Sequence, residues 1–192
     1  MNNYVCGTKG KAKDMEPAGG TQKGESMTSL MQPFILYAED DPNDVFWLDC
    51  AFKNAGIAHP IKVVSDGQRV LEYLSGTEPF ANRDLHPLPC LILLDIHLPK
   101  MNGFEVLEWI RQQPRLKHLP VVMFSNSSEP TDLEMARQLA ANDYLVKPMD
   151  PSGFDPMVKT LRDRWLLQPV AGPPPWQNTA ASINHLPTHG GA

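Results

Sequence analysis

The stretch LILLDIHLPKMNGFEVL, residues 91–107, decides the fold class of this 192-residue chain. It opens with four apolar residues, Leu91–Leu94, that do not alternate with polar ones. A strand of this kind is typical of a parallel sheet whose two faces are both covered by helices. Asp95 follows directly, at the carboxyl end of the strand, where open α/β sheets bind their ligands. The chemistry of this protein is therefore expected at the strand ends.

The alternation of strand and helix patterns continues on both sides of this stretch. Apolar runs of strand length occupy residues 34–38, 61–64, 91–94, 121–124 and 144–146. Asp41 is interpreted as the N-cap of the first helix, which has Pro42 in its first turn and ends at Gly56. Further helices are expected at about 67–75, 103–112, 130–141 and 151–167. This order predicts an α/β fold, a flavodoxin-like (βα)5 doubly wound parallel sheet with strand order 2-1-3-4-5.

Both ends of the chain differ in composition from its centre. Residues 1–30 are rich in Gly, Lys, Ser and Thr without an apolar period, and residues 169–192 are rich in Pro and Gly. We predict a disordered N-terminal tail, one folded domain over residues 31–168 and a disordered C-terminal tail. Met27 and Met31 stand just before the first apolar run, so the translation start is left open between these and Met1.

The overall composition argues against several classes of protein. A formal net charge of -5 argues against a general binder of nucleic acid or membrane surfaces, which needs clustered Lys and Arg. The three cysteines are odd in number and widely spaced, which favours neither a disulfide framework nor a metal site. No apolar run reaches the roughly 18 residues of a membrane span. We expect a cytoplasmic protein.

Reactive polar residues follow four of the five expected strands. Glu39 and Asp40 follow the first, Asp95 the third, Ser125 and Asn126 the fourth, and Lys147 ends the fifth. Carboxylates from neighbouring strands repel one another unless a cation joins them, and an all-oxygen site with room for water suits Mg²⁺. An Asp can also act as a nucleophile that forms an acyl phosphate. Taken singly, Ser125 is either a turn residue or a phosphate ligand.

The segments ILYAEDDPND (35–44), LILLDIHLPKMNGFEVL, PVVMFSNSSE (120–129) and NDYLVKP (142–148) together resemble the receiver domains of bacterial two-component response regulators. The resemblance covers about residues 33–167. It implies Asp95 as the phosphoacceptor, Glu39 and Asp40 as the acidic Mg²⁺ pair, and the backbone carbonyl of His97 as a further metal ligand. It also implies Ser125 as the switch hydroxyl, Tyr144 as the switch aromatic and Lys147 as the phosphate-binding lysine. The backbone N–H of Asn126 is expected to contact the phosphoryl group.

The closest likeness is to stand-alone regulators paired with bacteriophytochrome-type histidine kinases, which share a long loop before the third strand and a tryptophan near the last helix. These features correspond to Pro79–Pro89 and Trp165. A histidine kinase is therefore the expected partner, and a homodimer through the face of residues 130–141, 144–146 and 151–167 is one expected output. His97 stands where the family often has Asn, and together with Ser127 it is expected to set the hydrolysis rate of the phosphoryl group, so the lifetime of that group is left open. Asn126 stands where the family has a small residue after the switch hydroxyl, and it is expected to narrow the phosphate pocket.

Two other functions remain as alternatives. A phosphatase with an aspartyl-phosphate intermediate, of the haloacid-dehalogenase-like type, needs a second Asp two residues after the nucleophile, where this chain has His97. A phosphorylation-independent interaction module would ordinarily have lost Asp95, Asp40 or Lys147, and all three are present. We therefore expect a phosphoacceptor signalling protein that is not an enzyme.

Overall fold

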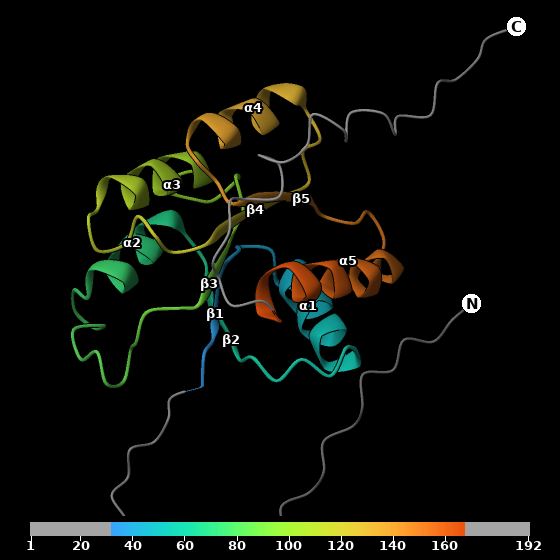
Figure 1. Ribbon diagram of the computed structural model, residues 1–192, viewed down its shortest axis with the longest axis horizontal. Helices are drawn as coiled ribbons and strands as arrows, with labels where there is room; N and C mark the ends of the chain where they lie inside the picture. The colour runs from blue at the N-terminus through green and yellow to red at the C-terminus, as the bar shows by residue number, and fades with distance from the viewer. Residues whose placement is uncertain (1–31, 168–192) are drawn as a thin grey trace, which may run out of the picture. The chain divides into compact units, whose positions relative to one another are not determined.

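The computed structural model describes residues 32–167, which form a parallel sheet flanked by helices (Figure 1). The predicted tails, 1–30 and 169–192, and the three candidate translation starts, Met1, Met27 and Met31, lie outside the described residues. The strands are β1 (Ile35–Ala38), β2 (Ile61–Val64), β3 (Leu91–Leu94), β4 (Val121–Ser125) and β5 (Asp143–Val146). The α-helices are α1 (Pro42–Asn54), α2 (Gly67–Ser75), α3 (Gly103–Gln112), α4 (Pro130–Gln138) and α5 (Phe154–Leu161).

The sheet has the predicted strand order, β2-β1-β3-β4-β5, with every neighbouring pair parallel. Ala38 at the end of β1 pairs with Leu94 at the end of β3. The residues that directly follow β1 and β3 therefore lie next to each other at the same edge of the sheet. This register, which is fixed by backbone hydrogen bonds, brings the acidic residues of the two strand ends together.

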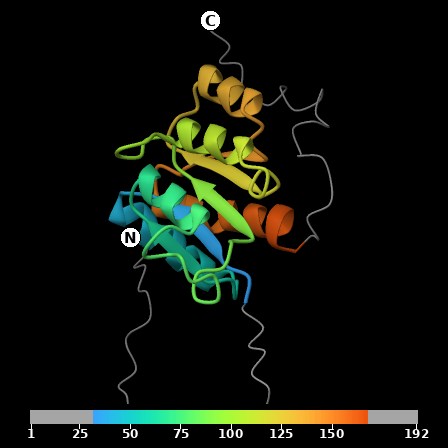
Figure 2. The same cartoon turned by 90° about the vertical axis from the view of Figure 1, so that its left-hand side faces the viewer.

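Helices cover both faces of the sheet, as Figures 1 and 2 show from two directions. Helices α2, α3 and α4 lie on one face, and α1 and α5 lie on the other. Alternate residues of a strand point to opposite faces, so Ile92 and Leu94 join the first core and Leu91 and Leu93 join the second. Both cores are apolar, which explains why the central strands carry no polar alternation.

Short polar motifs cap the N-terminus of α1, which follows β1, and that of α3, which follows the loop after β3. Asp41 is the N-cap of α1, as predicted, and its carboxylate accepts a 2.8 Å bond from the N–H of Asn43. Asn102 and Glu105 form a capping box at the start of α3. Both caps hold the connections that leave the carboxyl ends of β1 and β3.

Several boundaries differ from the prediction. The first and fifth strands begin one residue away from the predicted starts, at Ile35 and at Asp143. Ser125 belongs to β4, because Ser125 pairs with Val146 of β5. Helix α4 ends at Gln138, earlier than predicted, because Ala140 adopts a positive φ of 58° that turns the chain back toward β4. The predicted helix 151–167 is a 3₁₀ turn (Pro151–Gly153), then α5, then a π-helical turn (Arg162–Leu166).

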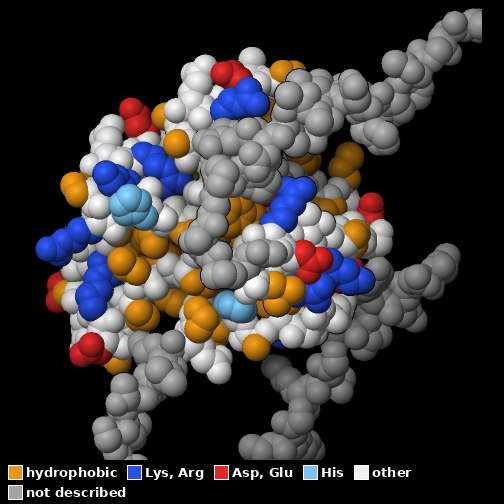
Figure 3. All heavy atoms as spheres, in the orientation of Figure 1, with side chains coloured by type: hydrophobic (Ala, Val, Ile, Leu, Met, Phe, Trp, Pro, Cys, Tyr) orange, Lys and Arg blue, Asp and Glu red, His pale blue; other side chains and the backbone are white. Residues whose placement is uncertain are grey.

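The surface of the described residues is mixed in character. The face seen in Figure 3 carries Lys and Arg side chains together with apolar and acidic ones. Within residues 32–167, no helix is long and apolar enough to cross a bilayer.

Candidate functional site

The carboxyl ends of β1, β3, β4 and β5 bring the predicted residues to one edge of the sheet. Glu39 and Asp95 are buried directly after β1 and β3, and Asp40 beside them is exposed. Ligand oxygens of these three carboxylates all lie within 4.8 Å of one another. Like charges at such range favour a cation between them. The oxygen-only donor set and its small size fit a hard divalent ion such as Mg²⁺.

Lys147 reaches this cluster from the end of β5. Its Nζ lies 2.5 Å from Oε2 of Glu39, 2.8 Å from Oδ2 of Asp95 and 2.9 Å from Oδ2 of Asp44. The Lys147 side chain is only 1% exposed, so these carboxylates replace water as its partners. Burial alone would lower the pKa of this ammonium group, but its hydrogen bonds to Asp95 and Glu39 raise that pKa above its ordinary value. Lys147 is therefore held as a buried cation beside the predicted nucleophile.

Two further residues shape the site that the sequence interpretation did not single out. The Tyr37 hydroxyl, inside β1, donates a 2.8 Å bond to Oε2 of Glu39. Asp44, in the first turn of α1, is the third carboxylate on Lys147. The sequence did carry a signal for Asp44. This residue lies in the helical turn that starts at the end of β1, and that turn lies over the strand ends. Tyr37 gave no comparable signal, because a tyrosine in a buried strand also suits a core.

The carboxylate of Glu39 has a shifted pKa. Burial, followed by the charge of Asp95, raises the pKa of Glu39, although the hydrogen bond and charge of Lys147 act in the opposite direction. Three carboxylates, from Glu39, Asp44 and Asp95, pair with the ammonium group of Lys147. Asp40 adds a fourth carboxylate beside Glu39 and Asp95. The site therefore keeps excess negative charge, which a divalent cation would offset.

The segment after β3 fixes the position of Asp95. The N–H of His97 donates to Oδ1 of Asp95 over 3.3 Å, while the side chain of His97 is exposed. Gly103, at the start of α3, lies so close that a Cβ there would be 2.1 Å from the carbonyl oxygen of Asp95. Only glycine permits this approach of backbone to backbone. Lys100, with a φ of 66°, anchors the same segment to Asp66, the N-cap of α2, over 2.8 Å.

The predicted switch residues lie beside the cluster along the segment after β4. Ser125 is fully buried, and its Oγ accepts a 3.3 Å bond from the N–H of Ser127. The Tyr144 hydroxyl donates a 2.9 Å bond to the carbonyl oxygen of Ser127, and Asn126 between them is exposed. Burial raises the pKa of the half-buried Tyr144 phenol. The structure thus brings Glu39, Asp40, Asp95 and Lys147 into one cluster, with the switch residues next to it; their roles stay predictions.

Known proteins resemble this chain in sequence and in fold. Residues 35–159 match the family described as response regulator receiver domain. Response regulator Rcp1 of Synechocystis is 34% identical over 132 residues, which are 69% of this chain and 88% of Rcp1. The crystal structure of the Mn²⁺-bound form of Rcp1 matches with a TM-score of 0.66 and 32% identity, over 73% of this chain and 99% of that chain.

Two further solved structures share the fold. The phosphorylated cyanobacterial phytochrome response regulator RcpA matches with a TM-score of 0.66 and 34% identity, over 71% of this chain and 95% of that chain. The bacteriophytochrome response regulator RtBRR matches with a TM-score of 0.62 and 36% identity, over 76% of this chain and 86% of that chain. Nearly the whole of each relative is therefore represented in this chain.

Proposed function

This chain belongs to the response regulator receiver family of two-component systems, and from that premise we propose that Asp95 accepts a phosphoryl group from a histidine kinase. The observation that carries the proposal is the position of Lys147, whose Nζ lies 2.8 Å from Oδ2 of Asp95. A carboxylate nucleophile beside a fixed ammonium group is suited to phosphoryl transfer, which depends on positioning and electrostatics. The product is a signalling state of the protein and not a released compound.

In the proposed reaction an oxygen of Asp95 forms a bond to the phosphorus of a phosphohistidine. The phosphorus–nitrogen bond breaks, and its electron pair stays on the imidazole nitrogen. Negative charge gathers on the phosphoryl oxygens during this step. The Lys147 ammonium group, the Ser125 hydroxyl and the backbone N–H of Asn126 are the groups that would offset it. Ser125 and Lys147 already lie at adjacent strand ends, because Ser125 of β4 accepts the backbone N–H of Lys147 on its carbonyl oxygen at 2.8 Å.

We assign the metal to Mg²⁺, held by the carboxylates of Glu39, Asp40 and Asp95 and by the backbone carbonyl of His97. The close approach of the three carboxylates supports a divalent ion, and so does the Mn²⁺-bound structure of Rcp1. When bound, such an ion supplies charge neutralisation for the phosphoryl oxygens. Glu39, Asp40 and one oxygen of Asp95 would hold it, and Asp95 would present its other oxygen to the phosphorus.

The partners follow from the relatives and from the surface. RcpA and RtBRR are described as phytochrome and bacteriophytochrome response regulators, which supports a bacteriophytochrome-type kinase in the cytoplasm as the donor. Leu133 and Met135 of α4 and Val146 of β5 are large apolar residues that are each more than 40% exposed. These exposed apolar residues of α4 and β5 support a homodimer through the surface of α4, β5 and α5 as one output, driven by Ser125 and Tyr144 when Asp95 carries the phosphoryl group.

Incubation with acetyl phosphate or beryllofluoride, with and without Mg²⁺, tests the proposal, with intact mass and size-exclusion chromatography as readouts. We expect a Mg²⁺-dependent mass increase of one phosphoryl group with acetyl phosphate. Asp95→Asn, which keeps the shape of the side chain, should abolish it. A phosphoryl group retained by Asp95→Asn would overturn the assignment of the acceptor. A folded wild-type protein that gains none would instead be a phosphorylation-independent interaction module.

A further inference from the structure

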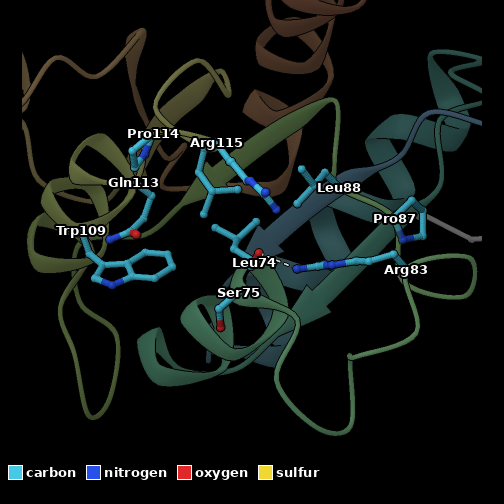
Figure 4. Close-up of a pocket in the computed structure, with 10 residues that line it drawn as sticks. Leu74, Ser75, Arg83, Pro87, Leu88, Trp109, Gln113, Pro114 and Arg115 are labelled. Atoms are coloured by element: carbon cyan, nitrogen blue, oxygen red, sulfur yellow. Dashed lines mark hydrogen bonds between the residues drawn. The ribbon is translucent and has the colours of Figure 1, made fainter.

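A cavity lies far from the carboxylate cluster, between α2, α3 and the segment that precedes β3 (Figure 4). Its volume is about 800 Å³, which is within the range of small-molecule sites. Most of its wall is apolar, and the residues that form this part are Leu74, Pro87, Leu88, Trp109, Pro114 and Leu116. Gly103 packs on Asp95 at the start of α3, whereas Gln113 lines the cavity after its end. The ten residues of α3 separate the two places by about 15 Å.

Two arginines bring positive charge to this apolar wall. In Figure 4, Arg83 and Arg115 come from opposite sides and both direct their guanidinium groups toward the middle of the cavity. Neither forms an ion pair with a carboxylate anywhere in residues 32–167. No Asp or Glu lines the cavity. The wall is therefore complementary to an anion that also has an apolar part.

Arg83 is fixed in place by neutral acceptors. Its Nη1 donates to the carbonyl oxygens of Tyr73 and His86 at 2.9 and 3.2 Å, and its Nη2 donates to that of Leu74 at 2.6 Å. Two of these carbonyls belong to the last turn of α2, so Arg83 also caps this helix. The helix end carries only about half a negative charge. Capping therefore leaves part of the Arg83 charge uncompensated, and Arg115, which is exposed, adds its full charge.

We propose that this cavity binds a small amphipathic carboxylate, with its apolar body against Trp109 and Leu74 and its carboxylate between Arg83 and Arg115. Trp109 offers a large apolar surface at one end, while the guanidinium groups can each donate two N–H groups to a carboxylate. Such a ligand would bind without competing for Asp95, because the cavity is at the opposite end of α3. The inference stands independently of the phosphoryl chemistry.

Titration of the full ¹⁵N-labelled chain with sodium octanoate, followed by NMR, tests this site. We expect saturable shifts of the Trp109 indole N–H and of the amides near Leu88 and Leu116. Octanol, which has the same apolar body without the charge, should bind more weakly. Arg115→Gln should weaken octanoate binding about fourfold, as for one partly exposed ion pair. Lys117→Gln is the matched control, because Lys117 is an exposed cation two residues away that does not line the cavity, and it should leave the affinity unchanged.

Several results would overturn the proposal. The absence of saturable shifts up to about 10 mM octanoate would do so, since weaker binding is not specific recognition. Equal binding of octanoate and octanol, with no effect of Arg115→Gln, would show an apolar crevice without a carboxylate site. Contacts between Trp109 and residues 168–192 before any octanoate is added would show that a segment of the same chain fills the cavity. Shifts of the same signals on dilution alone would assign it to a second copy.

Discussion

At the scale of single residues, the site is governed by the imbalance between one ammonium group and several carboxylates. Lys147 pairs with Glu39, Asp44 and Asp95, and each of these oxygens lies within 2.9 Å of its Nζ. Asp40 adds a further negative charge at the exposed edge. Buried charges are stable only when they are paired and hydrogen-bonded. The stability of the cluster therefore depends on the balance between the repulsion among its carboxylates and their attraction to Lys147. Changes of a single charge should therefore alter both metal binding and stability.

Asp40→Asn should weaken Mg²⁺ binding by at least about tenfold, because it removes a charged ligand and not merely a group that orients one. It should also slightly raise the free energy of unfolding of the metal-free protein, because one like charge leaves the cluster. Isothermal titration with Mg²⁺ and urea unfolding in a chelator give the two quantities. Asp84→Asn, an exposed acid outside the cluster, serves as the control. Unchanged Mg²⁺ affinity in Asp40→Asn would count against the proposed metal ligands.

At the scale of the elements, the connection from β4 to α4 is organised by Ser127. Its N–H donates to Ser125 Oγ, its carbonyl oxygen accepts the Tyr144 hydroxyl, and its own hydroxyl donates to Asp132 of α4 at 2.5 Å. One residue thus joins the predicted switch hydroxyl, the predicted switch aromatic and the first turn of α4. Ser125 and α4 are therefore connected by a chain of hydrogen bonds through Ser127.

Ser127→Ala should loosen this connection without unfolding the domain. The substitution removes two hydrogen bonds of the Ser127 hydroxyl, the one that it donates to Asp132 and the 3.2 Å bond that it accepts from the N–H of Glu129. Their loss costs about 1–2 kcal/mol locally, which corresponds to roughly five- to thirtyfold faster opening. Hydrogen exchange of residues 126–130 measured by mass spectrometry should show this increase, with the β3 amides unaffected. Ser128→Ala, an exposed neighbour, should leave the exchange unchanged. Equal exchange in Ser127→Ala and the wild type would show that the Asp132 bond does not hold the segment.

The contact between α2 and the segment after β3 should make stability depend on pH. Burial alone would raise the pKa of Asp66, but the bonds from Lys100 and from the N–H of Arg69 lower it below its ordinary value. A lowered pKa in the folded state stabilises the protein above the unfolded value of about 3.9, and this contribution is lost as the pH falls below that value.

Asp66→Asn should remove this dependence while keeping the helix cap, since Asn caps a helix as well as Asp does. We expect a loss of about 0.5 kcal/mol at pH 7, because Lys100 is 62% exposed and water screens the pair. The difference between variant and wild type should shrink below about pH 4. Urea unfolding at a series of pH values provides the measurement. A difference that stays constant from pH 7 to acid would show that the ion pair contributes nothing.

At the scale of the whole molecule, a ligand that mimics the phosphoryl group should stabilise the entire domain. Binding to the folded state alone raises the free energy of unfolding by about 2.7 kcal/mol at one hundred times the dissociation constant. Beryllofluoride with Mg²⁺ should therefore raise the midpoint of thermal unfolding, and Asp95→Asn should show no such rise. A similar rise in both proteins would place the ion elsewhere on the surface.

The class of fold and most of the residues of the candidate site could be predicted from the amino-acid sequence alone. Strand patterns such as Leu91–Leu94 require helices on both faces, and this requirement implies a parallel sheet with its ligands at one edge. Once the strands are parallel, Glu39, Asp95 and Lys147 must lie at the same edge, whatever the details of packing. The role of Asp41 as an N-cap could also be predicted from the sequence, because capping depends on a few adjacent residues.

Tertiary structure decided what depends on contacts between distant segments. The residues QLAAN, 138–142, favour a longer α4 by local propensity, yet the chain turns at Ala140 so that Asn142 can bond Val121 at the start of β4. The last turns widen into a π-helix, where Trp165 bonds Asp143 of β5. Likewise, only the folded chain places Asp44 on Lys147 and closes a cavity between Arg83 and Arg115. Periodicity and capping are local and visible in the sequence, whereas these contacts join residues far apart along it.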